Sequence, residues 1–239
     1  MEKSIEVIDA SVGYLSERIL KDFYFSARRG EIVGIFGPNG SGKTTLLCAI
    51  NGLARIWKGK ILINGIPLTP FTANSLRKKV GYVPQVFEVD PKIPVLTEEV
   101  ILMGGYGRIG IFHFPSKDDL SFLNKLCELF EISHLLKKPF GHLSGGEQKR
   151  TLIARALFQN PEILLLDEIF SYLDWKIKDK IANIIQSIHH EKFLTTLIVS
   201  HDLKIIERIC DRVLYLENGK VIFDGSKKKF FEKLNDGTF

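Results

Sequence analysis

The sequence has few cysteines, and they are poorly placed for cross-linking. Cys48, Cys127 and Cys210 are odd in number and far apart, and no two of them form a Cys-x-x-Cys pair. This spacing excludes a disulfide framework and a zinc ribbon. We therefore expect a reducing, cytoplasmic location.

Long apolar runs are also missing. The first 14 residues, MEKSIEVIDASVGY, carry acids and alternate in polarity, whereas a signal peptide would have an unbroken apolar run. No later stretch approaches the roughly 18 apolar residues that a membrane-spanning helix requires. The chain is therefore expected to be neither secreted nor membrane-spanning on its own.

Internal repeats, low-complexity tracts and Pro/Ser-rich linkers are absent from the 239 residues, so a second lobe has to be an insertion rather than a tethered domain. The 45% hydrophobic content is enough for a large core. The net charge is +5, but the lysines are interleaved with 28 acids. This distribution favours a solvated surface on a protein that binds an anionic ligand, and no nucleic-acid partner is expected.

Hydrophobic periodicity predicts two kinds of strand. Residues 4–10 and 22–28 alternate apolar and polar side chains, as half-buried strands do. The Asn-Gly dipeptides within 61–65 and 212–225 indicate antiparallel strands, and the second predicts a hairpin. Four short apolar runs are instead typical of parallel strands buried on both faces, namely EIVGIF (31–36), VGYV (80–83), EILLLD (162–167) and TLIVS (196–200).

Residues 97–159 have an almost entirely helical pattern. Three helix starts are predicted there, at Thr97, Ser116 and Ser144. The predicted fold is α/β, with a parallel-sheet core and an antiparallel β subdomain formed by 1–96 and 160–239, and with residues 97–159 as an inserted α-helical subdomain.

The strongest chemical motif is GPNGSGKTT, which follows strand 31–36 and precedes a helix, as in a phosphate-binding P-loop. Its glycines let successive backbone N–H groups face one concavity, and the helix dipole adds positive charge. We expect Lys43 to reach the β- and γ-phosphates and the Thr44 hydroxyl to bind Mg²⁺. The predicted nucleotide-binding residues of this loop are Gly37, Pro38, Asn39, Gly40, Ser41, Gly42, Lys43, Thr44 and Thr45.

Polar residues also follow three of the other predicted core strands. Asp167 and Glu168 end the run ILLLDE, where Asp167 would hold Mg²⁺ and Glu168 would polarise the attacking water. Gln85 could touch both the metal and the water, and His201 could donate to the γ-phosphate. The carboxyl ends of parallel strands meet at one sheet edge, so these side chains are expected beside the P-loop.

A second glycine pair opens a helix in HLSGGEQKR, residues 142–150, without the lysine and threonine of a P-loop. The order of P-loop, Gln85, LSGGE, ILLLDE, SYLD and His201 resembles the ATP-binding cassette (ABC) ATPases and covers nearly the whole chain. This resemblance implies a P-loop NTPase with a RecA-like core that hydrolyses ATP with Mg²⁺.

The same resemblance implies a head-to-tail homodimer, in which the LSGGE loop of one subunit caps the γ-phosphate on the P-loop of the other. The residues that it adds are Ser144, Gly145, Gly146 and Glu147 for the nucleotide, Tyr14 for the adenine, Ser144, Gly146 and Asp174 for the dimer interface, and Glu168, His201, Lys43 and Gln85 for catalysis.

Two positions depart from the family pattern. Ile169-Phe170 follow Glu168 where the family usually has proline, and Tyr172 stands where a small residue is usual. Both are expected near the dimer seam, where they would alter coupling between subunits. Hydrolysis is expected to be intact, because Asp167 and Glu168 are present.

Residues 97–120 and 138–157 look like the ATPase subunits of importers for metal ions (zinc, manganese) and iron chelates. This implies a cassette peripheral to the inner face of the cell membrane, bound to two membrane-spanning permease subunits and served by an extracytoplasmic substrate-binding protein. The alternatives are a soluble ABC ATPase for iron–sulfur cluster assembly and a DNA-repair ATPase. The short interval between P-loop and LSGGE, which has no sustained heptad repeat, disfavours the latter.

Overall fold

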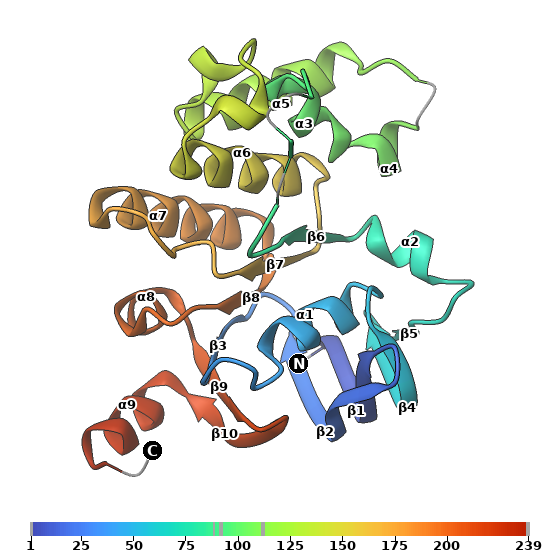
Figure 1. Cartoon of the computed structure of the whole chain (residues 1–239), viewed down its shortest axis with the longest axis vertical. Helices are drawn as coiled ribbons and strands as arrows, with labels where there is room; N and C mark the ends of the chain where they lie inside the picture. The colour runs from blue at the N-terminus through green and yellow to red at the C-terminus, as the bar shows by residue number, and fades with distance from the viewer. Residues whose placement is uncertain (1, 88, 91–92, 111–112, 238–239) are drawn as a thin grey trace.

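The computed structural model describes residues 2–87, 89–90, 93–110 and 113–237. Its central sheet has the strand order β10-β9-β3-β8-β7-β6, with every neighbouring pair parallel except β10 and β9 (Figure 1). The strands are β3 (Ile32–Phe36), β6 (Val80–Val83), β7 (Ile163–Asp167), β8 (Thr195–Val199), β9 (Arg212–Glu217) and β10 (Lys220–Ser226). The four predicted parallel strands are confirmed to within one residue at each end.

A second, antiparallel sheet has the order β2-β1-β4-β5. It consists of β1 (Lys3–Tyr14), β2 (Glu17–Arg28), β4 (Arg55–Ile63) and β5 (Ile66–Pro67). β1 and β2 are longer than the alternating pattern predicted. Their pairing shifts register between Val7 and Ala10, and Asp9 and Asp22 have positive φ angles of 47°. Such bulges break the two-residue period, so the alternation ends before the strand does.

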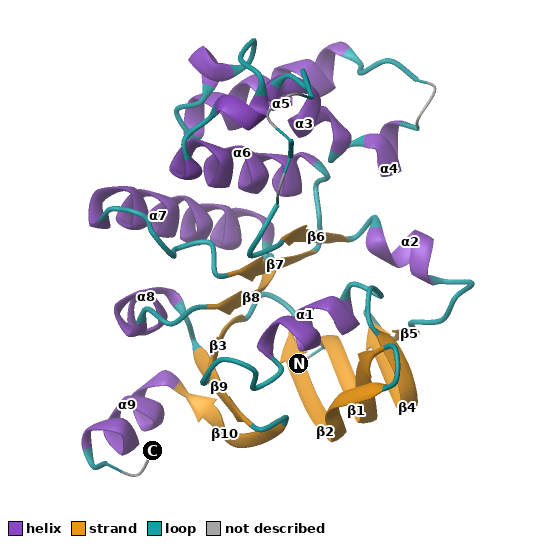
Figure 2. Cartoon of the chain, in the orientation of Figure 1, coloured by secondary structure: helices purple, strands orange, loops and turns teal. Residues whose placement is uncertain are grey.

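Helices cover the central sheet and fill the space between the two sheets (Figure 2). α1 lies beside the antiparallel sheet, α7 and α8 lie along the opposite side of the central sheet, and α3 to α6 form the separate upper group in Figure 1. The helices are α1 (Lys43–Ile50), α2 (Ala73–Arg77), α3 (Thr97–Met103), α4 (Tyr106–Ile109), α5 (Lys117–Leu129), α6 (Gly145–Phe158), α7 (Trp175–Lys192), α8 (Leu203–Ile209) and α9 (Lys227–Asn235), with 3₁₀ turns at Ser133–Leu135 and Phe140–His142.

The apolar side chains form two cores, one on each side of the central sheet. One core packs Leu164, Leu166 and Ile198 against α6 to α8, and the other packs Ile35 and Leu165 against α1 and the antiparallel sheet. Successive residues of a strand point to opposite faces, so β7 contributes to both cores. Among the described helices, none combines the length and the apolar character needed to cross a lipid bilayer.

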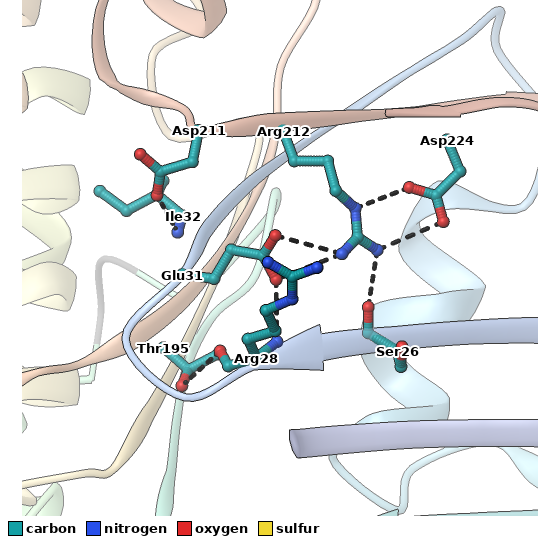
Figure 3. A network of polar contacts seen from close by, with 8 residues as sticks. All are labelled: Ser26, Arg28, Glu31, Ile32, Thr195, Asp211, Arg212 and Asp224. Carbon is teal, nitrogen blue, oxygen red and sulfur yellow. Dashed lines mark hydrogen bonds and ion pairs between the residues drawn. The ribbon is translucent and has the colours of Figure 1, made fainter. Parts of the chain in front are cut away.

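Arg212 at the start of β9 joins the two sheets (Figure 3). Its guanidinium donates to both oxygens of Glu31 at 3.1 and 3.2 Å, to the Ser26 carbonyl oxygen at 2.6 Å, and to Asp224 at 2.6 and 3.2 Å. The side chains of Arg212 and Glu31 are only 17% and 11% exposed. Asp211 beside it accepts from the Ile32 N–H at 2.8 Å. These bonds set the position of β2 relative to β3, and hence of the antiparallel sheet relative to the core.

Replacing Arg212 by alanine should lower the free energy of unfolding by about 3 kcal/mol, because it leaves the largely buried Glu31 carboxylate without its ion-pair partner and with only the Arg28 N–H as donor. Urea denaturation of the purified chain measures this. Arg208→Ala is the matched control, since Arg208 pairs with Asp179 at the surface and its loss should cost at most about 1 kcal/mol. Equal losses in the two variants would contradict the role given to Arg212.

Candidate active site

The P-loop joins β3 to α1 in a conformation that needs glycine. Gly37 has a φ of 148°, and a Cβ there would lie 2.1 Å from the Leu216 carbonyl oxygen. Gly42, which precedes α1, has a φ of 98°. The loop can therefore pass close to the hairpin of β9 and β10 and still turn its backbone toward the start of α1.

Lys43 folds back across this loop. Its ammonium donates to the Gly37 carbonyl oxygen at 2.9 Å and to the Pro38 carbonyl oxygen at 2.8 Å. Burial lowers the pKa of Lys43, and the carboxylates of Glu168 and Asp167 oppose that shift. The lysine thus supplies a desolvated positive charge directly beside the backbone of the loop.

Asp167, the last residue of β7, is fully buried, and within the described part of the chain neither of its carboxylate oxygens accepts a hydrogen bond. Burial raises the pKa of Asp167 to about 6; the neighbouring Thr44 hydroxyl opposes the shift, and Glu168 adds to it. Buried polar atoms normally have partners. A carboxylate with unused oxygens next to a threonine hydroxyl has the chemistry of a site for a hard divalent cation such as Mg²⁺.

Glu168 lies one residue further on and is held from two sides. The Ser171 hydroxyl donates to Glu168 Oε2 at 2.9 Å, and His201 Nε2 lies 3.1 Å from Oε1. The Glu168 backbone has a positive φ of 49°, and its N–H donates to the Val199 carbonyl oxygen at 3.0 Å. Glu168 is only 4% exposed, and it lines the cavity beside the P-loop.

A cavity of about 320 Å³ lies between the P-loop and the ends of β7 and β8. The predicted residues that line it are Asn39, Gly40, Gly42, Lys43, Thr44, Thr45, Gln85, Glu168 and His201. Ile19 and Val199 also line it and were not predicted, since an apolar residue in a strand has no distinguishing pattern. Pieces far apart in the sequence thus meet at one sheet edge, as expected for parallel strands.

Tyr14, the predicted adenine-stacking residue, ends β1 and does not itself line this cavity. Its side chain interacts with Cys48 and with the Thr45 hydroxyl on α1, and Thr45 does line the cavity. Burial and the Cys48 thiol raise the pKa of the Tyr14 hydroxyl. Tyr14 is still 38% exposed, so it stands at the rim of the site.

The LSGGE segment forms the start of α6, away from this cavity. Ser144 caps the helix: the Glu147 N–H donates to its hydroxyl at 3.4 Å, and the Ser144 N–H donates to Glu147 Oε2 at 2.8 Å. The Ser144 hydroxyl, which donates to Glu147 Oε2 at 2.7 Å, and the Ser144 N–H hold the pKa of Glu147 below its usual range. Ser144 and Gly145 are exposed, and a Cβ on Gly145 would meet no atom within 4 Å. The predicted capping box is present, and its helix N-terminus faces solvent within the single chain.

The segment after Glu168 divides between the core and the surface. Ile169 and Phe170 are each 1% exposed and belong to the hydrophobic core of the single chain, and their place near a dimer seam stays a prediction. An apolar pair directly after a buried strand is drawn into the core beneath α7. Tyr172 is fully exposed with a φ of 61°, and Asp174 is exposed as the residue before α7.

Comparison with known proteins assigns most of the chain to the family that the sequence motifs resemble. The family model described as ABC transporter matches residues 20–171. The Yersinia pestis protein "Chelated iron transport system membrane protein YfeB" is 36% identical over 219 residues, 91% of this chain and 72% of that protein. The Bacillus subtilis "Manganese transport system ATP-binding protein MntB" is 34% identical over 226 residues, 95% of this chain and 88% of that one.

Among solved structures, the dimeric ATP-binding cassette MJ0796, in a post-hydrolysis state bound to ADP and Pi, superposes with a TM-score of 0.82 at 28% identity, covering 93% of this chain and 98% of that chain. The predicted P-loop NTPase fold is thereby confirmed. With its P-loop, acidic strand end and LSGGE helix in the predicted places, the chain belongs to the ABC transporter family and is an ATP-hydrolysing cassette of that family.

Proposed function

We propose that the chain binds ATP with Mg²⁺ in the cavity beside the P-loop and hydrolyses it to power import of a metal ion or an iron chelate. The observation that carries the proposal is the convergence of Lys43, the unpartnered Asp167 carboxylate and the Glu168 carboxylate at one edge of the sheet. A merely structural acid pair at a strand end would be exposed or paired, and Asp167 is neither.

Binding uses the backbone N–H groups at the start of α1 and the Lys43 ammonium. Lys43 would exchange the carbonyl oxygens of Gly37 and Pro38 for phosphate oxygens, which are stronger acceptors for a cation. Thr44 and Asp167 would hold Mg²⁺; Thr44 and Gln85 line the cavity, and Asp167 lies behind the lining next to Thr44. When bound, the metal supplies positive charge that neutralises the β- and γ-phosphate oxygens.

Hydrolysis would use Glu168 as the group that polarises the attacking water. Ser171 and His201 orient its carboxylate, and His201 lines the cavity where a γ-phosphate would end. This arrangement satisfies the requirement that a general base lie within hydrogen-bond reach of its water and be held in a fixed orientation.

The exposed start of α6 supports a head-to-tail homodimer. Ser144 and Gly145 do not line the cavity of their own chain, so a phosphate above the P-loop can meet them only from a second copy or after a large rearrangement. A helix N-terminus facing a phosphate contributes roughly 0.3 to 1 kcal/mol at an exposed site and up to about 2 when partly buried. Loss of the γ-phosphate removes that attraction, so the dimer would loosen after hydrolysis.

A groove between the core and the helical region is the proposed docking site for the permease subunits. It measures about 310 Å³ and includes Tyr82, Pro84, Phe87 and Arg155 in its wall. Burial lowers the pKa of Arg155, and among the described residues no carboxylate pairs with it. We place the cassette on the cytoplasmic face of the membrane, with residues 97–159 as the subdomain that contacts the permease and 1–96 with 160–239 as the catalytic core.

The cargo is proposed by kinship. Relatives at 34 to 36% identity are named for chelated iron and for manganese, which supports import of a metal ion or iron chelate, served by an extracytoplasmic binding protein, over iron–sulfur cluster assembly or DNA repair. Cellular uptake of manganese, zinc and chelated iron, measured with and without the gene, distinguishes these cargoes; unchanged uptake of all three would contradict the proposal.

Asp167→Asn should stabilise the cassette when nucleotide and metal are absent. The folded state raises the pKa of Asp167 to about 6, so its charged form costs stability that grows as pH rises through about 4 to 6 and is complete above that range. The gain should be about 2–3 kcal/mol at pH 7.5 and about half of that at pH 5, as measured by urea unfolding. A gain independent of pH would show that the carboxylate charge is not its cause.

Glu168→Gln should lower the ATPase rate by about 10² to 10⁴ while nucleotide binding is kept. The stalled ATP state should then accumulate as a dimer in size-exclusion chromatography with ATP and Mg²⁺, and as a monomer without nucleotide. If only monomer elutes with ATP and Mg²⁺, the proposed dimer is wrong even if the rate falls.

Ser144→Arg should abolish ATPase activity, because it places a bulky side chain on the helix start that is to meet the partner's phosphate. Each monomer should still bind nucleotide through its own P-loop, with an affinity within about twofold of the unmodified chain, as titration with a fluorescent ATP analogue can measure. Loss of binding together with activity would mean that the LSGGE loop acts within its own chain.

A further inference from the structure

Lys149 on α6 reaches beneath the turn that carries Glu168. Its ammonium donates to the Glu168 carbonyl oxygen at 3.2 Å and to the Ser171 carbonyl oxygen at 2.5 Å, and it lies 5.9 Å from the centre of the Tyr172 ring. It therefore holds both ends of the four-residue turn 168–171. It does so from α6, whose N-cap Ser144 lies about one and a half helical turns before Lys149.

The turn held by Lys149 is conformationally unfavourable. Glu168, its first residue, and Tyr172, the residue directly after it, have positive φ angles of 49° and 61° although neither is glycine. Such conformations persist only where the surroundings over-determine them. Besides Lys149, the turn has backbone bonds from the Glu168 N–H to Val199 and from the Ser171 N–H to Glu168, a bond from the Ser171 hydroxyl to Glu168 Oε2, and the burial of Ile169 and Phe170 in the core.

Burial of the Lys149 ammonium costs solvation free energy. Burial lowers its pKa, the Glu168 carboxylate opposes that shift, and Lys178 adds to it; among the described residues Lys149 forms no ion pair with a carboxylate within 4.0 Å. The ammonium instead donates hydrogen bonds to two backbone carbonyl oxygens of the turn. The desolvated ammonium thus stabilises one backbone geometry, namely the one that points the Glu168 carboxylate at the P-loop cavity.

α6 touches the same segment at a second point. A Cβ on Gly146 would lie 3.4 Å from the Leu173 side chain, so the helix start packs closely on the residue after Tyr172. The LSGGE helix and the turn 168–171 therefore form one packed unit, with Lys149 as its polar link.

We propose that Lys149 is a positioning residue for Glu168, which sets the catalytic carboxylate by fixing the turn 168–171 from the LSGGE helix. The inference rests on the proposed role of Glu168 as the water-polarising group. Lys149 does not line the P-loop cavity of its own chain, so it should act on the chemical step and leave nucleotide binding unchanged.

The test compares Lys149→Met and Lys149→Arg with Lys192→Met. The methionine variant should lower kcat about tenfold to a hundredfold, as small misplacements of catalytic groups do, with the KM for ATP within about twofold. Arginine keeps the charge and the donors, so it should restore most of kcat. Lys192, the last residue of α7, is the matched control. Burial lowers its pKa too, and its ammonium donates a hydrogen bond to Asn160 Oδ1 at 2.7 Å.

The double variant Lys149→Met/Glu168→Gln separates positioning from other roles. If Lys149 acts through Glu168, the double variant should hydrolyse ATP no more slowly than Glu168→Gln alone and should still form the ATP-dependent dimer. Additive losses, a missing dimer, or full activity in Lys149→Met would each overturn the inference.

Should Lys149→Met not fold, Lys149→Gln, whose amide can reach one of the carbonyl oxygens, is expected to have an intermediate kcat; wild-type kcat there would equally overturn it. Absence of a rate loss in Glu168→Gln itself would instead refute the proposed role of Glu168.

Discussion

Parallel pairing of β3, β8, β7 and β6 is the constraint on which the rest of the molecule depends. It brings four carboxyl ends to one edge, and each of those ends carries a polar element: the P-loop, His201, the pair Asp167-Glu168 and Gln85. A parallel sheet needs cover on both faces, which here comes from α1 with the antiparallel sheet on one side and α6 to α8 on the other. The cover leaves the carboxyl edge open, and the cavity lies there.

At that edge the chain keeps charges that it does not fully pair. Lys43 is desolvated against its own loop, and Asp167 is buried with unused oxygens. A protein selected for stability alone would have apolar or paired groups at these places. A functional site that is complete only with its ligand is expected to carry such a local cost in stability. The segment from Glu168 to Tyr172 adds to this local cost, because its backbone is strained at both ends and is held by Lys149.

Local rules predicted much of this, and their failures have identifiable causes. The runs 31–36 and 162–167 were found because strands buried on both faces are continuously apolar, and the capping box at Ser144 because it is a contact between near neighbours. The full length of β1 was missed because bulges change the phase of its alternation. The burial of Ile169 was not predicted, because it depends on how α7 packs over the sheet end, which no local pattern records.

By itself, the sequence determined the elements whose physics is local: the P-loop between strand and helix, the Asn-Gly hairpin, the helix starts and the apolar period of the core strands. Only the tertiary structure decided which of these meet. Lys149 and the carbonyl oxygens that it binds are 19 and 22 residues apart, and Arg212 is 181 residues from Glu31. Contacts of this kind depend on the packing of whole elements, so the residues that make them carry no local signature of their roles.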